Sequence, residues 1–100
     1  MKHSRAPQDL MIGTSLMGYV LATRDELEAT FGEPYEYGEG DKVTTEWVLH
    51  FEDLTIATIY DWKRYEQGAP YSDENYDWHI GGDSELAVTR VLEAVLENKN

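Results

Sequence analysis

The sequence predicts an α+β fold, with one domain in which a mainly antiparallel sheet of about four strands carries two helices on one face. The first observation is the central stretch 43–63, which is rich in β-branched and aromatic residues. The second is a pair of helix signals, one before this stretch and one near the C-terminus. The resulting order of strand, helix, three strands and helix is typical of helices layered on an antiparallel sheet.

The first arm of the central stretch alternates between two kinds of position, which is the period of a strand with one face in the core. The expected core face holds Val43, Thr45, Trp47, Leu49 and Phe51, and the opposite face holds Thr44, Glu46, Val48, His50 and Glu52. The second arm, 55–62, carries apolar groups on both faces, so its own pattern does not assign a face.

The turn between the two arms allows two registers. A two-residue turn at 53–54 pairs Trp47 with Tyr60, whereas a three-residue turn at 52–54 pairs Trp47 with Ile59. We favour the first register, because it collects the large aromatic residues into cross-strand pairs on one side of the sheet. In either register a leucine at position 54 is unusual, since such turns favour Gly or Asn.

The N-terminal third of the chain is predicted to contain a tail, a strand and a helix. Residues 1–9 have little to bury and are expected to form a flexible tail, so that the domain covers 10–100. A strand is predicted over 14–21. Thr23 and Glu26 stand at the spacing of a capping box, which predicts a helix over 24–31 that ends at Gly32.

The remaining elements are two loops, one strand and one helix. The loops cover 34–41 and 64–75, the strand covers 75–80, and Gly81-Gly82 is expected to turn the chain. A second helix is predicted over 85–98, capped by Asp83 or Ser84. Its apolar residues recur at helical spacing, namely Val88, Val91, Leu92, Val95 and Leu96.

Charge is the strongest global feature, with 20 acidic residues against 8 basic ones and a net charge of −12. Such a field repels phosphate backbones and anionic lipid, so we expect basic protein partners and neither direct nucleic-acid binding nor membrane binding. No apolar run reaches the length of a signal peptide or a membrane span, and the chain has no cysteine. We therefore expect a soluble protein without a disulfide framework or thiolate metal site.

No motif assigns catalysis or a cofactor. The serines have no base at motif spacing, and the carboxylate pair at 52–53 consists of adjacent turn residues. His50 and His79 lie on strands that could be neighbours, and Asp61 or Asp77 would complete a weak candidate metal site. Lone strand histidines are more often packing or surface residues, so we expect no metal and no cofactor.

The two long loops combine spaced carboxylates with tyrosines. Tyrosine gives a large contact area at small entropic cost, and spaced carboxylates bind the Arg and Lys of a basic surface. The alternative is a pair of ordinary solvated loops with tyrosines lying back on the sheet. The candidate partner-binding residues are Tyr35, Glu36, Tyr37, Glu39, Asp41, Tyr71, Asp73, Glu74 and Asp77.

Three strings carry a resemblance, namely GTSLMGYVLATRDELEATFGEP, DKVTTEWVLHFEDLTIATIYDWK and DWHIGG. Together they resemble a family of small uncharacterised acidic proteins encoded by bacteriophages, over most of the chain from Gly13 to about Val91. Members tend to have Gly where this chain has Leu54. The resemblance implies synthesis in the cytoplasm of an infected bacterium, and it assigns no activity to any residue.

The leading hypothesis is a non-enzymatic protein that binds a basic surface of a host or phage protein through the two loops. By analogy with small acidic phage proteins, it would inhibit a nucleic-acid-binding or defence protein. Some of those acidic phage proteins act as DNA mimics. A second hypothesis is a small-ligand or metal-binding protein, or an enzyme, that uses the polar sheet face. A third is a self-associating subunit that pairs through a strand edge or through Trp62 and Trp78.

Overall fold

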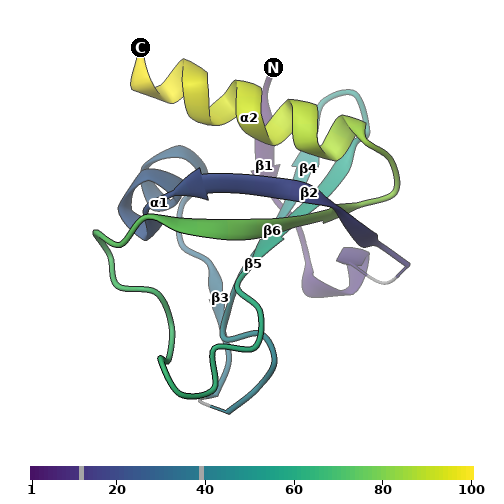
Figure 1. Ribbon diagram of the computed structural model, residues 1–100. Helices are drawn as coiled ribbons and strands as arrows, with labels where there is room; N and C mark the ends of the chain where they lie inside the picture. The colour runs from purple at the N-terminus through teal and green to yellow at the C-terminus, as the bar shows by residue number, and fades with distance from the viewer. Residues whose placement is uncertain (12, 39) are drawn as a thin grey trace.

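A computed structural model describes residues 1–11, 13–38 and 40–100. It contains one six-stranded antiparallel sheet, two α-helices and a short 3-10 helix, as Figure 1 shows. Along the sheet the strand order is β1-β4-β5-β6-β2, and β3 also pairs with β4. The elements are β1 (His3–Arg5), η1 (Gln8–Met11), β2 (Ser15–Ala22), α1 (Arg24–Phe31), β3 (Tyr35–Glu36), β4 (Thr45–Phe51), β5 (Ile56–Tyr60), β6 (Tyr76–Gly82) and α2 (Leu86–Lys99).

The α+β class is confirmed, but the expected number of strands is wrong. The two additional strands, β1 and β3, pair with successive parts of the same edge of β4. β1 comes from the segment 1–9, expected to be a tail, and aligns His3 with Phe51. β3 comes from an expected loop and aligns Tyr35 with Glu46. Both strands satisfy backbone groups that β4 would otherwise leave unpaired, and their own short polar sequences carry no strand signal.

The favoured register of the central hairpin is also wrong. Trp47 lies opposite Ile59, and Tyr60 lies opposite Glu46, as the alternative three-residue turn predicts. The N–H of Thr55 donates to the Asp53 side chain at 3.1 Å, and Leu54 adopts a positive φ of 73°. A three-residue turn that ends in a left-handed residue is the usual geometry of such a hairpin, so Leu54 occupies the position where glycine is favoured.

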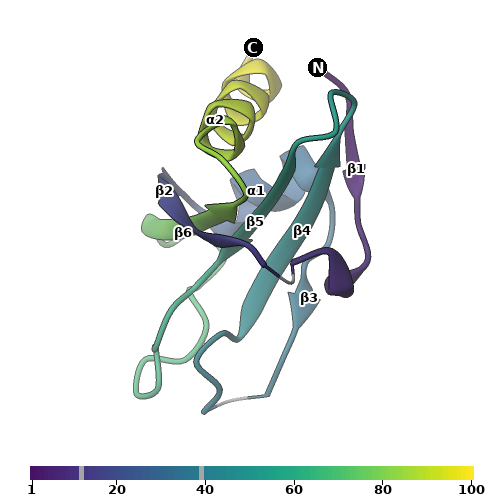
Figure 2. The same cartoon turned by 90° about the vertical axis from the view of Figure 1, so that its right-hand side faces the viewer.

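One apolar core joins both helices to the same face of the sheet. The rings of Trp47 and Trp78 meet edge to face with centroids 5.2 Å apart, and each indole N–H donates to a backbone carbonyl, of Gly32 and Ala22 respectively. The buried core residues include Val20, Leu27, Phe31, Trp47, Leu49, Phe51, Ile59, Trp78, Ile80, Val91 and Val95. The opposite face of the sheet carries no α-helix, as Figure 2 shows.

Helix α1 matches its predicted bounds, because its capping box forms. The Thr23 side chain accepts from the Glu26 N–H at 3.1 Å, and the Glu26 carboxylate accepts from the Thr23 N–H at 3.0 Å. Helix α2 begins one residue later than predicted, with the Ser84 hydroxyl accepting from the Leu86 N–H at 3.3 Å.

The Gly81-Gly82 pair extends β6, and this overturns its expected role as a turn. A Cβ at Gly81 would lie 2.6 Å from the Thr58 hydroxyl, and one at Gly82 would lie 2.5 Å from the Cβ of Ala87. The two glycines therefore permit close packing of β6 against β5 on one face and against the start of α2 on the other.

Candidate functional site

A row of four side chains crosses the helix-free face of the sheet. Glu46 pairs with Tyr60, Tyr60 with His79, and His79 with Tyr19, so the row runs over β4, β5, β6 and β2. The rings in the row touch, since the His79 centroid lies 5.3 Å from that of Tyr60 and 4.9 Å from that of Tyr19. We call these four residues the Glu46 row.

The N-terminal segment covers a neighbouring part of this face. η1 contacts both β4 and β5, and Val48, which shares the face with Glu46, is fully buried. Tyr19 remains exposed and Tyr60 half-buried. The part of the face that stays open is therefore the part that carries the Glu46 row.

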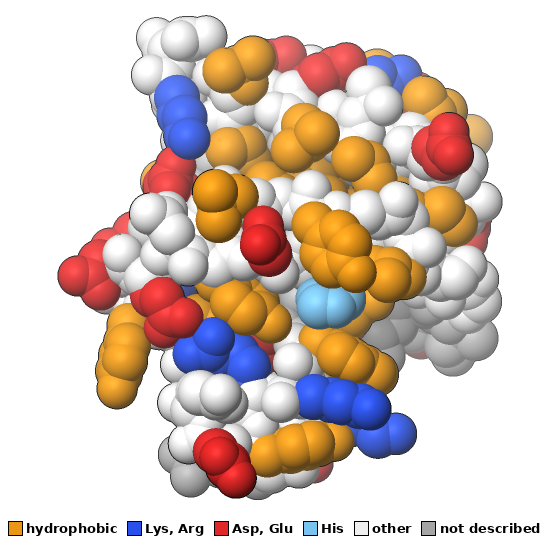
Figure 3. Space-filling view, in the orientation of Figure 1, with side chains coloured by type: hydrophobic (Ala, Val, Ile, Leu, Met, Phe, Trp, Pro, Cys, Tyr) orange, Lys and Arg blue, Asp and Glu red, His pale blue; other side chains and the backbone are white. Residues whose placement is uncertain are grey.

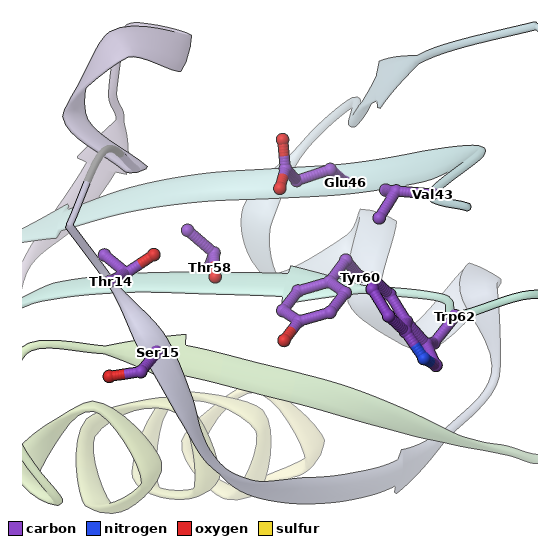
Figure 4. A pocket seen from close by; sticks show the side chains of 7 residues that line it. All are labelled: Thr14, Ser15, Val43, Glu46, Thr58, Tyr60 and Trp62. Atoms are coloured by element: carbon purple, nitrogen blue, oxygen red, sulfur yellow. The ribbon is translucent and has the colours of Figure 1, made fainter. Parts of the chain in front are cut away.

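A cleft opens at the Glu46 end of the row. One hollow of about 290 Å³ is lined by Thr14, Ser15, Val43, Glu46, Thr58, Tyr60 and Trp62. In Figure 4 the rings of Tyr60 and Trp62 lie side by side, and their centroids are 6.2 Å apart. A second hollow of about 390 Å³ shares Val43, Glu46 and Trp62 and adds Tyr37, Asp41 and Lys42. We call the two hollows together the Trp62 cleft.

Glu46 supplies the carboxylate of this cleft. It is only 5% exposed, and its Oε1 accepts a hydrogen bond from the Tyr37 hydroxyl at 2.8 Å. Gln8 in turn donates to that hydroxyl at 2.9 Å. Tyr37 thus holds the carboxylate in place through one oxygen, and a carboxylate has about four acceptor sites, so Glu46 can accept further hydrogen bonds.

Burial governs the ionisation of this group and its partner. It raises the pKa of Glu46, because a desolvated carboxylate is less stable than a desolvated acid. Burial, followed by the hydrogen bond to Glu46, raises the pKa of Tyr37 to about 12. A positive charge placed beside Glu46 would favour the ionised form of the carboxylate. Binding of a cation and ionisation of Glu46 would therefore promote each other.

Trp62 forms the exposed wall of the cleft. It is 40% exposed, whereas Trp47 and Trp78 are buried at 2% and 0%. Its ring already lies 5.6 Å from the Lys63 ammonium. An exposed indole next to a carboxylate is the combination that binds cations through its ring face.

His79 lies in the middle of the row, and its Nδ1 is buried without a hydrogen-bond partner among the described residues. Burial lowers the pKa of His79. Its position between two tyrosine rings makes it a packing residue of the row, with its neutral form favoured.

The predicted loop residues divide into three groups. Tyr37 and Asp41 line the Trp62 cleft, while Glu39 lies outside the described residues. Tyr35, Glu36 and Glu74 make internal contacts with, respectively, the Ala6 carbonyl, Arg24 and Arg64. The exposed group is Tyr71, Asp73 and Asp77.

The two loops lie at the same end of the molecule, as Figure 1 shows, and a hydrogen bond joins the residues that border them. The Lys63 N–H donates to the Lys42 carbonyl at 2.7 Å. Figure 3 shows both acidic and basic side chains at this end. Lys42, Lys63 and Arg64 thus accompany the carboxylates, and the loops do not form a purely acidic surface.

The weak candidate metal residues are not gathered into one site. Asp61 is fully buried and accepts from Thr44 and Thr45, whereas His50 pairs with Ile56 near the hairpin turn. Within 1–11, 13–38 and 40–100, no group of three or more His, Asp or Glu side chains has a geometry that could hold a metal ion.

Sequence reasoning missed Glu46, Tyr60 and Trp62 as a cleft. The alternation in 43–51 assigns Glu46 to the face away from the core, which is where it lies. The favoured register, however, placed Tyr60 beside Trp47, on the core face. Only the register observed in the structure brings Tyr60 next to Glu46.

Comparisons with protein-family models, with curated proteins and with solved structures gave no match to this chain. The resemblance to bacteriophage proteins therefore stays a prediction from the sequence. Neither described helix combines the length and the apolar character needed to cross a bilayer.

Proposed function

We propose that this protein is a non-enzymatic binding protein that holds a basic segment of another protein, with one Arg or Lys side chain in the Trp62 cleft. The observation that carries the proposal is the Glu46 carboxylate, 5% exposed, in a cleft walled by Tyr60 and Trp62. A cation in this position has a carboxylate oxygen to bind and aromatic faces to lie against.

The electrostatics of the whole chain support a cationic ligand. The net charge of −12 raises the local concentration of positive partners and speeds their association. Asp41 adds a carboxylate at the rim of the cleft, next to Lys42. The exposed Tyr71, Asp73 and Asp77 supply further area and charge for the surface around the inserted side chain.

The family resemblance suggests the biological setting. We propose that the partner is a host or phage protein with a basic surface, such as a nucleic-acid-binding or defence protein, and that binding inhibits it in the bacterial cytoplasm. Surfaces that bind phosphate are rich in Arg, which is the side chain that the Trp62 cleft would accept.

Fluorescence of Trp62 tests the site directly, because the other two tryptophans are buried. The probe is a short peptide of Gly, Ser and Asn with one central Arg, compared with the same peptide carrying Gln. We expect the Arg peptide to shift the emission and the Gln peptide to leave it unchanged. Added salt should weaken binding.

Glu46→Gln keeps an acceptor for Tyr37 and removes only the charge. It should weaken binding of the Arg peptide roughly tenfold to a hundredfold, the range for losing a hydrogen bond to a charged group. The matched control, Glu66→Gln, removes one exposed charge outside the proposed binding surface and should leave affinity within about twofold, as surface changes usually do. Equal binding of the Arg and Gln peptides, or unchanged affinity in Glu46→Gln, would refute the proposal.

A salt-graded pull-down from bacterial lysate then identifies the natural partner by mass spectrometry. The expected partner is retained by the wild type at low salt, is released at high salt and is lost with Glu46→Gln. A partner retained equally by Glu46→Gln but lost on neutralising Asp41, Asp73 and Asp77 would assign binding to the loops and not to the cleft.

A further inference from the structure

The outer edge of β2 is unpaired. Among the described strands β2 pairs only with β6, so alternate N–H and C=O groups of its eight residues point away from the sheet. Exposed edges are usually protected by charge, proline, short length or a β-bulge, and β2 has one register irregularity, between Leu16 and Gly18. The segment SLMGYVLA has no charge and no proline, and it is the longest strand of the sheet.

Exposed apolar side chains flank this edge on both faces of the sheet, with Tyr19 on the helix-free face and helix α2 over the other face. Leu16, Tyr19 and Leu21 of β2 are exposed, and so are Leu92 and Leu96 of α2. Helix α2 packs directly on β2, since a Cβ at Gly18 would lie 2.8 Å from the Val88 side chain. Leu92 and Leu96 follow Val88 at intervals of four and therefore lie on the same side of the helix. Figure 3 shows hydrophobic side chains gathered where α2 and β2 face the viewer.

We infer that β2 pairs antiparallel with β2 of a second copy of this chain about a two-fold axis, with Leu92 and Leu96 packing over the junction. An antiparallel pair of identical edges is self-complementary, because each outward donor on one strand has an acceptor on the other. The two sheets would then form one continuous sheet.

Charge opposes a second copy least at this edge. Two chains with a net charge of −12 repel each other over most of their surfaces, and they approach most easily through an uncharged segment. The opposite edge of the sheet, in contrast, is charged, because β1 contains Arg5 and β3 contains Glu36. The pairing leaves the Trp62 cleft open, because Glu46 stands at the other end of the Glu46 row from Tyr19.

The test is the molar mass of the full chain by light scattering over a concentration series, at low and high salt. We expect a dimer whose stability increases with salt, because salt screens the repulsion between the copies. Cation binding in the cleft responds to salt with the opposite sign, so the two proposals fail separately.

Leu21→Lys places a charge on the edge at a side chain that is 63% exposed, so the monomer should still fold. It should raise the dissociation constant of the dimer at least tenfold, and Leu92→Lys should do the same. Leu54→Lys, the matched control at the 76% exposed hairpin turn, should leave the dimer unchanged. Hydrogen exchange of the β2 amides should slow as the protein concentration rises in the wild type and in Leu54→Lys. It should not slow in Leu21→Lys or Leu92→Lys.

Three results would overturn the inference. The first is a monomer at every concentration in both salts. The second is a dimer equally stable in Leu21→Lys and Leu92→Lys, or growth beyond two copies. The third is a monomer whose β2 amides become protected only in bacterial lysate, which would assign the edge to a strand of another protein.

Discussion

The carboxylate of Asp61 accepts hydrogen bonds from both the backbone N–H and the side-chain hydroxyl of Thr44. It also accepts from the Thr45 N–H at 3.0 Å, and the side chain is fully buried. Asp61, the residue after β5, thus binds the segment that leads into β4. These hydrogen bonds position the neighbouring Val43, which lines the Trp62 cleft.

Asp61→Ala should destabilise the fold by roughly 2–4 kcal/mol, because it leaves several buried donors without an acceptor. The free energy of unfolding in urea, followed by far-ultraviolet circular dichroism, measures the loss. Asp73→Ala removes an exposed carboxylate and should change stability by less than about 0.5 kcal/mol. Equal stability of the two variants would show that the Thr44 contacts contribute nothing.

Leu54→Gly should stabilise the protein by about 0.5–1 kcal/mol. Leu54 has a φ of 73°, a conformation in which a Cβ is strained, and its side chain is 76% exposed and buries little. Leu54→Ala keeps the Cβ and the strain, so its urea midpoint should stay near that of the wild type. A loss of stability in Leu54→Gly would mean that the leucine side chain makes a stabilising contact.

Glu46→Gln should stabilise the protein at pH 7 while it weakens peptide binding. Burial raises the pKa of Glu46 above its ordinary value of 4.5, so the folded state binds this proton more tightly than the unfolded chain does. The stabilising effect of the protonated form is therefore complete below pH 4.5 and is lost as the pH rises through the folded-state pKa.

The variant should accordingly gain stability over the wild type at pH 7, and the two should converge at acid pH. Urea unfolding at a series of pH values measures this difference. Glu66→Gln removes an exposed carboxylate and should show no such trend. A gain that is independent of pH would contradict the link to Glu46 ionisation.

Gly82→Ala should destabilise the fold by about 1–3 kcal/mol through overpacking. The new Cβ would lie 2.5 Å from the Cβ of Ala87 and 3.1 Å from the Ile56 carbonyl oxygen, so α2 or β5 must shift. Gly38→Ala meets its nearest atom at 3.7 Å, in the Asp41 side chain, and should be close to neutral. Thermal unfolding of both variants provides the comparison.

Several local features of the structure are predictable from the sequence. The capping box at Thr23 and Glu26 predicts the bounds of α1, and both of its hydrogen bonds form. The alternation in 45–51 predicts which side chains of β4 face the core, including Trp47, whereas Val43, expected on the same face, lines the Trp62 cleft. These features depend on residues within a few positions of one another, where side-chain chemistry and backbone geometry are directly coupled.

Features that depend on distant pairing were not predictable. β1 and β3 carry no strand signal of their own and become strands because the edge of β4 offers them hydrogen bonds. The Gly81-Gly82 pair reads locally as a turn, yet it extends β6 because the packing of Thr58 and Ala87 requires residues without a Cβ. A local pattern cannot report contacts made across the sheet.

The sequence by itself determined the fold class, the helix α1, the core face of β4 and the net charge of −12. Only the tertiary structure decided the hairpin register, and with it the Trp62 cleft, because a shift of one residue moves every side chain of a strand to the other face. In this hairpin the choice rests on three turn residues in which Leu54 accepts a positive φ. That choice sets Tyr60 beside Glu46 instead of Trp47.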